Sequence, residues 1–462
     1  MKRIISILTV IVVMLNFVAL TKSQTVKAVS FLPPEQLYSD SAVLYNLDTQ
    51  TIVYERKPDT KCFPAQLTQI MTAIVAIEKA PSLDSVIECP ATIFDEFEEY
   101  RAKYSDEDSY NEVTTCGIES GEQLKIEHLL YAMLLKSSCE AASTIAYNIG
   151  QGSIQNFVNM MNEKAKAIGA ENTHFTNPHG LYDEGQYSTA SDLLKITEYA
   201  LSLPGFSEIA GTYSYSTGPT NIHSEGIEMN NVNLMMNPES MYYYEYCKGI
   251  KTGNSDQSKR CLISKASHDG QNYIAVLLGA PFMLDDDGDY KFTHLIDAKK
   301  IFEWAFKYIE HKVVLDAAKE VSTLKINYAK GKDYINLKPV SNVKCMWDKT
   351  KDISLIDTTD IEYVYEELNA PVKAGEKLGT LKLTYLKEEI GRVDLVAYSD
   401  AELSYVKCSM AILDSYFTSS AFKTAIRVAC GLTIIYLVIA AYTINLRAKR
   451  RREKRRAKNR QE

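Results

Sequence analysis

The amino-acid sequence predicts an α+β fold in which strands at both ends of a domain enclose a run of helices. Strand patterns occupy residues 41–55 and 249–278, and helical patterns fill the interval between them. Short alternating segments follow from 313 to 407, and an uncharged stretch lies at 428–446. We therefore expect an antiparallel sheet with a helical cluster, then a small sandwich-type β domain, then a C-terminal transmembrane helix.

The first 30 residues are typical of a secretory signal. Met1-Lys2-Arg3 is basic, and residues 4–20 carry no charge. Small residues near Ala28 or Ser30 offer a cleavage point, and an uncleaved segment would leave an N-terminal anchor with the same orientation. Either alternative exports the residues that follow.

The first domain is predicted to span residues 31–311. It begins with two strands, 41–48 and 51–55, joined by a turn at 48–50. A helix follows from 67 to 79, and its start places Gln66 and Gln69 three residues apart on one face.

The rest of this domain alternates between helical and extended patterns. The acidic, tyrosine-rich stretch 93–115 is expected to be an exposed loop or short helix. Helices are predicted over 126–135, through Tyr147, over 157–168 with a stop at Gly169, and over 295–309. Strands are predicted over 249–253, 260–266 and 273–278.

The C-terminal part consists of four predicted segments. Residues 312–408 form the β domain, with strands at 323–328, 361–365 and 393–397. Residues 409–427 are an amphipathic lead-in, and residues 428–446 are long enough to span roughly 28 Å as a helix. The tail 447–462 is strongly basic, which places it in the cytoplasm and the main domains outside.

The charge distribution argues against nucleic-acid binding by the exported part. The net charge is -8, yet the tail contributes about +8 and the signal region about +4. The exported domains therefore carry about −20. The basic tail, next to a membrane span, is expected to contact anionic lipid.

Neither a metal site nor a cofactor is expected. None of the nine cysteines forms a Cys-x-x-Cys pair, and no zinc-type His/Glu spacing occurs. His179 is interpreted as a structural hydrogen-bonding residue. The acidic run 285–289 lacks the glutamate of a calcium loop, because Ile296 stands there. Eight cysteines face an exported compartment, and the sequence leaves their pairing open.

Five motifs occur in the order of a known family. They are Asp48–Glu78 with Pro64–Thr72 inside it, Leu134–Ala141, Asn177–Leu181 with Tyr187–Ala190 and Asp192, Asn230–Met235, and Gly249–Gly253. Together, over roughly residues 35–440, they resemble the serine D-alanyl-D-alanine carboxypeptidases, the low-molecular-mass penicillin-binding proteins (peptidase S11). The resemblance implies a peptidoglycan substrate and a place at the bacterial cell membrane.

The resemblance also implies roles for particular residues. A serine hydroxyl attacks the carbonyl of the penultimate D-alanine, with nearby amines easing the removal of its proton. Ser137 stands at the position of the proton relay. Lys251, Thr252 and Gly253 stand on the strand that holds the peptide and its terminal carboxylate.

Three positions depart from the family pattern. Gln66 stands where the nucleophilic serine is expected, and Gln69 stands where the lysine is expected. Cys139 replaces an asparagine that contacts the substrate. A glutamine amide is not a nucleophile and does not titrate near neutral pH. We therefore expect catalysis to be impaired while the frame of the site is kept.

Three hypotheses about function follow. The leading one is a membrane-anchored protein that binds peptidoglycan stem peptides, or a cell-wall protein, without cleaving them. The second is an active D-Ala-D-Ala carboxypeptidase that uses Ser137 or Cys139 as a surrogate nucleophile. The third is a purely structural scaffold of the cell envelope.

Overall fold

The computed structural model describes Pro33, residues 36–104 and residues 113–458. The predicted signal segment lies outside the described residues. The chain divides into two compact units. The first comprises the described residues up to Val314 with Lys344–Asp357 and Thr384–Gly391, and the second comprises Leu315–Val343, Thr358–Leu383 and the residues from Arg392 onward.

A five-stranded antiparallel sheet organises the first unit, in the order β2-β1-β9-β8-β7. Its strands are β1 (Ser41–Asn46), β2 (Thr51–Arg56), β7 (Cys247–Ser255), β8 (Lys259–His268) and β9 (Gln271–Ala280). Residues 41–46 are buried throughout, because β1 lies inside the sheet and is covered by helices. The strands from the two ends of the domain therefore meet in one sheet, as the sequence predicts.

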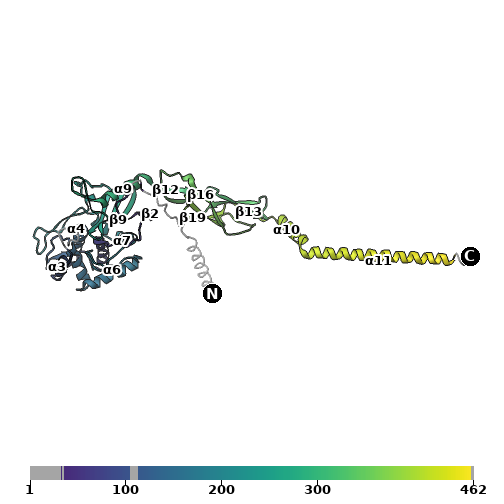
Figure 1. The fold of residues 1–462 in the computed structure, drawn as a ribbon, viewed down its shortest axis with the longest axis horizontal. Helices are drawn as coiled ribbons and strands as arrows, with labels where there is room; N and C mark the ends of the chain where they lie inside the picture. Colours follow the sequence, from purple (N-terminus) through teal and green to yellow (C-terminus); the bar gives the residue numbers. More distant parts are fainter. Residues whose placement is uncertain (1–32, 34–35, 105–112, 459–462) are drawn as a thin grey trace, which may run out of the picture. The chain divides into compact units, whose positions relative to one another are not determined.

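Helices gather beside this sheet (Figure 1). They are α2 (Gln69–Lys79), α3 (Thr92–Tyr104), α4 (Ile126–Lys136), α5 (Cys139–Ile149), α6 (Ile154–Ile168), α7 (Ala190–Ser202), α8 (Phe206–Ala210) and α9 (Thr293–Tyr308). Helix α2 packs against α4, α5, α6 and α7, while α9 packs on β8 and β9. Gly169 ends α6 with a φ of +84°, as its position in the sequence indicates.

Two details differ from the sequence-based expectation. The predicted helix start at Gln66 is a short 3-10 turn, η1 (Ala65–Thr68), which runs into α2. The stretch expected to be an exposed loop or short helix does contain a helix, α3, but its Ile93 and Phe97 are buried, so only the expected exposure differs. An acidic composition misled the prediction, because two apolar residues at i and i+4 suffice to seat a helix on the core.

Small sheets and turns complete the first unit. They include β3 (Val86–Glu88) with β4 (Gln123–Lys125), β5 (Ser214–Ser216) with β6 (Glu228–Asn230), β10 (Met283–Leu284) with β11 (Tyr290–Lys291), and η2 (Leu234–Met236). All nine cysteines are described, and each is a free thiol.

The C-terminal region is built from strands, as expected. A six-stranded sheet has the order β16-β18-β19-β14-β13-β17, and β12 pairs with β15. The strands are β12 (Ile309–Leu315), β13 (Ser322–Asn327), β14 (Tyr334–Pro339), β15 (Val343–Asp348), β16 (Ile356–Tyr363), β17 (Leu368–Asn369), β18 (Lys377–Tyr385) and β19 (Glu388–Ala397), with η3 (Ile353–Leu355) between β15 and β16.

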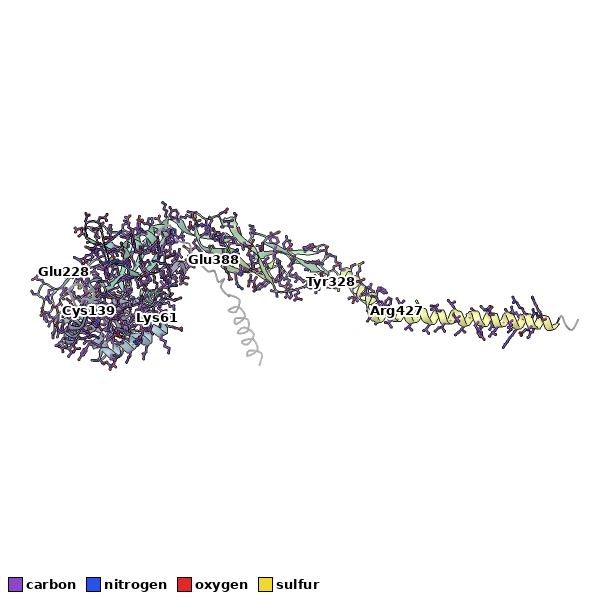
Figure 2. The ribbon with its side chains drawn as sticks, in the orientation of Figure 1. Lys61, Cys139, Glu228, Tyr328, Glu388 and Arg427 are labelled. Carbon is purple, nitrogen blue, oxygen red and sulfur yellow. The ribbon has the colours of Figure 1, made fainter. Side chains whose placement is uncertain are left out.

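Two helices follow the last strand. In α10 (Tyr405–Thr418), large apolar residues such as Met410 and Leu413 are exposed. The helix α11 (Ser420–Lys458) contains the segment Ser420–Arg456, which is long and apolar enough to cross a membrane. Its side chains project on all sides (Figure 2). These exposed apolar surfaces are what a bilayer would cover.

Candidate active-site cleft

A cavity of about 200 Å³ is lined by four of the predicted site residues, Gln66, Ser137, Thr252 and Gly253, while Gln69, Cys139 and Lys251 lie outside its lining. Its walls come from the η1 turn, the junction between α4 and α5, the strand β7, and the start of α9. The lining includes Gln66, Ser137, Thr252, Gly253, Asn254 and Arg260. Residues from positions 66 to 295 of the chain therefore meet in one cleft, although they are far apart in sequence.

The side chain of Gln66 crosses to the neighbouring strand. Its Oε1 atom accepts a hydrogen bond of 2.9 Å from the backbone N–H of Asn254. The turn and the strand are in close contact here, because a Cβ on Gly253 would lie 3.1 Å from the backbone nitrogen of Gln66. Only glycine fits at position 253 without displacing the turn. The Gln66 amide is thus a fixed part of the cleft wall.

Gln69 links three segments below the cleft. Its side chain is fully buried, and its Nε2 atom donates to the carbonyl oxygens of Ser137 and His179, both at 3.1 Å. Its Oε1 atom has no hydrogen-bond partner among the described residues. The uncharged amide therefore fastens α2 to the α4–α5 junction and to the Asn-Pro-His-Gly turn.

Ser137 and Lys251 form a close pair. Ser137 ends α4 in the left-handed conformation, with a φ of +62°, which turns the chain sharply before α5. The Nζ atom of Lys251, on β7, lies 2.5 Å from the Oγ atom of Ser137. Burial lowers the pKa of Lys251 from 10.5 to about 7. Near neutral pH, this amine therefore exchanges between a charged and a neutral form.

The buried amine makes the stability of the fold depend on pH. Between the folded pKa of about 7 and the unfolded value of about 10.4, the unfolded chain binds a proton that the folded protein lacks. The free energy of unfolding of the wild type should therefore increase relative to that of Lys251→Met as the pH rises across this window, because the other titrating groups are common to both proteins. Urea unfolding of both proteins at a series of pH values measures the difference. Parallel curves would contradict the assignment.

Cys139 lies outside the cavity lining. It is the first residue of α5, fully buried, and its backbone N–H donates to the carbonyl of Thr114 at 2.8 Å. Figure 2 shows it among the packed side chains of the first unit. Burial raises the pKa of the thiol well above its ordinary value, and the Glu140 carboxylate adds to this. The thiolate that nucleophilic attack requires is therefore strongly disfavoured.

The Asn-Pro-His-Gly turn is held by its own polar groups. The Oδ1 atom of Asn177 accepts from the N–H of Gly180 at 2.7 Å, and the Nδ1 atom of His179 accepts from the N–H of Leu181 at 3.1 Å. The Nε2 atom of His179 lies 3.2 Å from Glu96 on α3. The described residues contain no group of three side chains suited to hold a metal ion. Both ring nitrogens of His179 lie within hydrogen-bond distance of a partner.

The structure adds residues that sequence reasoning missed. Arg260, on β8, lines the cavity and stacks its guanidinium 4.2 Å from the ring centroid of Phe292. His294 is buried beside it, and burial together with the Arg260 charge lowers the pKa of the imidazole to about 3. A charged residue at the start of an apolar strand was the available signal for Arg260. No pattern in the sequence indicates the contact of Asn254 with Gln66.

Known proteins resemble both parts of the chain. Residues 25–282 match the D-alanyl-D-alanine carboxypeptidase family (Peptidase_S11), and residues 310–403 match the C-terminal domain of penicillin-binding protein 5. The D-alanyl-D-alanine carboxypeptidase DacF of Bacillus subtilis is 27% identical over 408 residues, which cover 87% of this chain and 95% of DacF. DacA of Haemophilus influenzae is 25% identical over 83% of this chain and 91% of its own length.

Solved structures agree with this fold. The carboxypeptidase DacD from Francisella tularensis superposes with a TM-score of 0.60 at 23% identity, covering 82% of this chain and 97% of DacD. The Streptomyces K15 DD-transpeptidase superposes with a TM-score of 0.50 at 25% identity, covering 60% of this chain and all of the transpeptidase. Both the described fold and the family match thus lead to one assignment: this chain belongs to the D-alanyl-D-alanine carboxypeptidase family, with its peptidase domain followed by a β domain of the penicillin-binding protein 5 type.

Proposed function

We propose that this chain binds the D-alanyl end of peptidoglycan stem peptides in the cleft and does not cleave them. The relatives are D-alanyl-D-alanine carboxypeptidases, which supports a ligand of this class. Thr252 and Arg260 line the part of the cleft suited to a terminal carboxylate, because Arg260 carries a cationic group and Thr252 supplies a hydroxyl. The amine of Lys251 is buried beside them, against the hydroxyl of Ser137. The β7 strand would hold the peptide backbone beside the carboxylate.

The observation that carries this proposal is the hydrogen bond from Asn254 to Gln66. Acyl transfer needs backbone N–H donors that are free to stabilise a developing oxyanion. The Asn254 N–H, next to Gly253 and the turn, is engaged by the Gln66 carbonyl. The side chain at the serine position thus supplies no nucleophile and also occupies a donor on the cleft wall.

Gln69 supports the same conclusion from below the cleft. Its two hydrogen bonds to backbone carbonyls hold the frame without a titratable group. A lysine amine at this position would donate to the same oxygens and also accept a proton when neutral. The substitution therefore keeps the positioning role and removes the acid–base role.

We place the protein at the bacterial cell membrane. The helix α11 supplies the span, and its basic end favours the cytoplasmic side, so that the domains before it lie on the cell-wall side. The signal-like start at residues 1–30 supports export. This arrangement brings the cleft to the compartment that contains stem peptides.

Calorimetry on the full chain in detergent tests the proposal. A stem pentapeptide ending in D-Ala-D-Ala should bind, and the same peptide with an amidated C-terminus should bind about tenfold more weakly or worse, because it lacks the carboxylate. Arg260→Met should weaken the free acid and leave the amide unchanged. No binding of the free acid at millimolar concentration would overturn the proposal.

Gln66→Ala provides a second test at the same site. Removing the amide frees the Asn254 N–H for the ligand carbonyl, so we expect affinity for the pentapeptide to rise about threefold to tenfold. Gln66→Glu keeps an acceptor oxygen for the Asn254 N–H but adds a negative charge to the cleft, so it should bind the pentapeptide more weakly than the wild type. Unchanged affinity in Gln66→Ala would show that the Asn254 donor does not take part in binding.

A second candidate function, residual hydrolysis through Ser137, has one observation in its favour. The hydroxyl of Ser137 lies beside an amine whose pKa is lowered to about 7, which suits a general base. Cys139 is a weaker candidate because its thiol is buried and protonated. Solved variants of the Streptomyces transpeptidase replace a serine and, two positions later, a cysteine by alanine, which is the spacing of Ser137 and Cys139.

Intact mass after incubation with penicillin separates the two functions. Binding alone predicts no covalent adduct on the folded protein. An adduct that disappears in Ser137→Ala and persists in Cys139→Ala would establish the hydrolytic alternative. The reverse pattern would assign the chemistry to the thiol, against its burial.

A further inference from the structure

A second and larger cavity lies elsewhere in the first unit. Its volume is about 570 Å³, within the range of roughly 300–1,000 Å³ found for small-molecule sites. Its lining includes Tyr243, Tyr246, His268, Lys299, Glu303 and Phe306. It shares no lining residue with the active-site cleft. An inference about it therefore does not depend on the proposed peptide binding.

Aromatic rings form the wall of this cavity. The ring centroids of Tyr246 and His268 lie 3.9 Å apart, and that of Phe306 lies 5.4 Å from His268 and 6.2 Å from Tyr246. These rings come from three elements: the segment before β7, the last residue of β8, and α9. Tyr246 and Phe306 are half-buried, so part of each ring remains accessible to a ligand.

The charged groups around the rings balance. Glu245 and Glu303 oppose Lys299 and Lys307 in the lining. A site with two carboxylates and two amines has no preference for an anion or a cation, yet it offers both acceptors and donors. Such a lining also disfavours an aliphatic lipid chain, because the polar groups would lose water without gaining hydrogen bonds.

The aromatic wall is held rigidly. The carbonyl of Tyr246 accepts from the N–H of Ser267 at 3.0 Å, and the N–H of Tyr244 donates to the carbonyl of Met235 at 2.9 Å. The ring of Tyr244, which also lines the cavity, packs at 90° to that of Tyr246, with centroids 5.4 Å apart. A ligand would therefore meet a surface that loses little conformational freedom on binding.

We propose that this cavity binds a neutral oligosaccharide of N-acetylated sugars. A pyranose ring has an apolar C–H face, which packs on the negative face of an aromatic ring, and a rim of hydroxyl and acetamido groups, which both donate and accept. Rings such as Tyr246, flanked by Glu303 and Lys307, match these two properties in one place. The cavity thus constitutes a carbohydrate subsite separate from the cleft.

Titration of the full chain in detergent with chitotetraose, a neutral oligomer of N-acetylglucosamine, tests this proposal. The wild type should bind. Tyr246→Ala should weaken binding by about tenfold or more because stacking area is lost, while Tyr246→Phe should keep it within about threefold. Glu303→Ala changes an exposed residue and should weaken binding without affecting the fold. The cleft variant Arg260→Met should bind like the wild type.

Two results would overturn the proposal. One is the absence of chitotetraose binding by the wild type at millimolar concentration. The other is wild-type affinity in both Tyr246→Ala and Glu303→Ala, since binding would then occur elsewhere. Thermal unfolding of Tyr246→Ala establishes that it is folded, and Glu303→Ala provides an answer that does not depend on that variant. Failure of pentapeptide binding in the cleft would leave this result unaffected.

Discussion

The double substitution Gln66→Ser with Gln69→Lys is expected to produce a protein that penicillin acylates. Removing a nucleophile that acts as a unit with its base costs on the order of a million-fold in rate, so restoring both should recover at least about a thousandfold over the wild type. Intact mass spectrometry after a timed incubation measures the adduct. Release of D-alanine from a stem pentapeptide measures the hydrolytic reaction.

The structure favours this restoration because the frame of the site is present. A lysine at position 69 would donate to the carbonyls of Ser137 and His179 that the amide now contacts. A serine at position 66 is smaller than glutamine and would release the Asn254 N–H. Lys251 would then lie close to a second buried amine, and the repulsion would help keep one of the two neutral.

The single variants are the matched controls. Gln66→Ser alone has a hydroxyl without its base, and Gln69→Lys alone has a base without a nucleophile, so each should acylate far more slowly than the pair. Adding Cys139→Asn tests the third position that the sequence resemblance singles out. A folded double variant that forms no adduct in a day would show that the site has diverged beyond these two positions.

Gly180→Ala is expected to cause the largest loss of stability of any single methyl addition in the site. Gly180 has a φ of +86°, and a Cβ there would lie 2.2 Å from the carbonyl oxygen of Ala65. Backbone must move to remove this overlap, and Ala65 itself has an unusual φ of +47°. We expect a loss of about 3 kcal/mol or more, from strain and overpacking together.

Gly270→Ala is the control for the backbone conformation alone. Its φ is +76°, and a Cβ on this residue would meet no atom within 4 Å, so the cost should be only about 1–2 kcal/mol. Urea unfolding followed by the fluorescence of the two buried tryptophans, Trp304 and Trp347, compares the two variants. Equal losses in the free energy of unfolding would show that the backbone around Ala65 moves away from the added methyl group without an energetic penalty. Because Ala65 precedes Gln66, Gly180→Ala should also disturb the cleft.

The sequence predicted the architecture well for definite physical reasons. Period-2 and helical patterns are local, so the strands at 41–55 and the helix ended by Gly169 could be found without the rest of the chain. Contacts between residues far apart in the chain were harder to predict from the sequence. The resemblance to a family supplied Ser137 and Lys251 as neighbours, and the structure gives their contact.

What the sequence could not predict depends on contacts between distant residues. The bond between Gln66 and Asn254 joins positions 188 residues apart, and no local pattern encodes it. A role of Arg260 in the cleft was not predicted, because a single charged residue next to an apolar run usually marks only the end of a strand. The segment of helix α3 was expected to be exposed because of its charge, yet Phe97 is buried and Glu96 contacts His179.

The helix α11 has a mechanical consequence. Its 39 residues extend about 58 Å, nearly twice the roughly 30 Å thickness of a hydrocarbon core. The apolar stretch and the basic residues that follow it therefore belong to one continuous helical rod over the described residues. A rotation of the apolar part about its axis turns the arginines by the same angle, so torque applied at one end of the rod is delivered at the other.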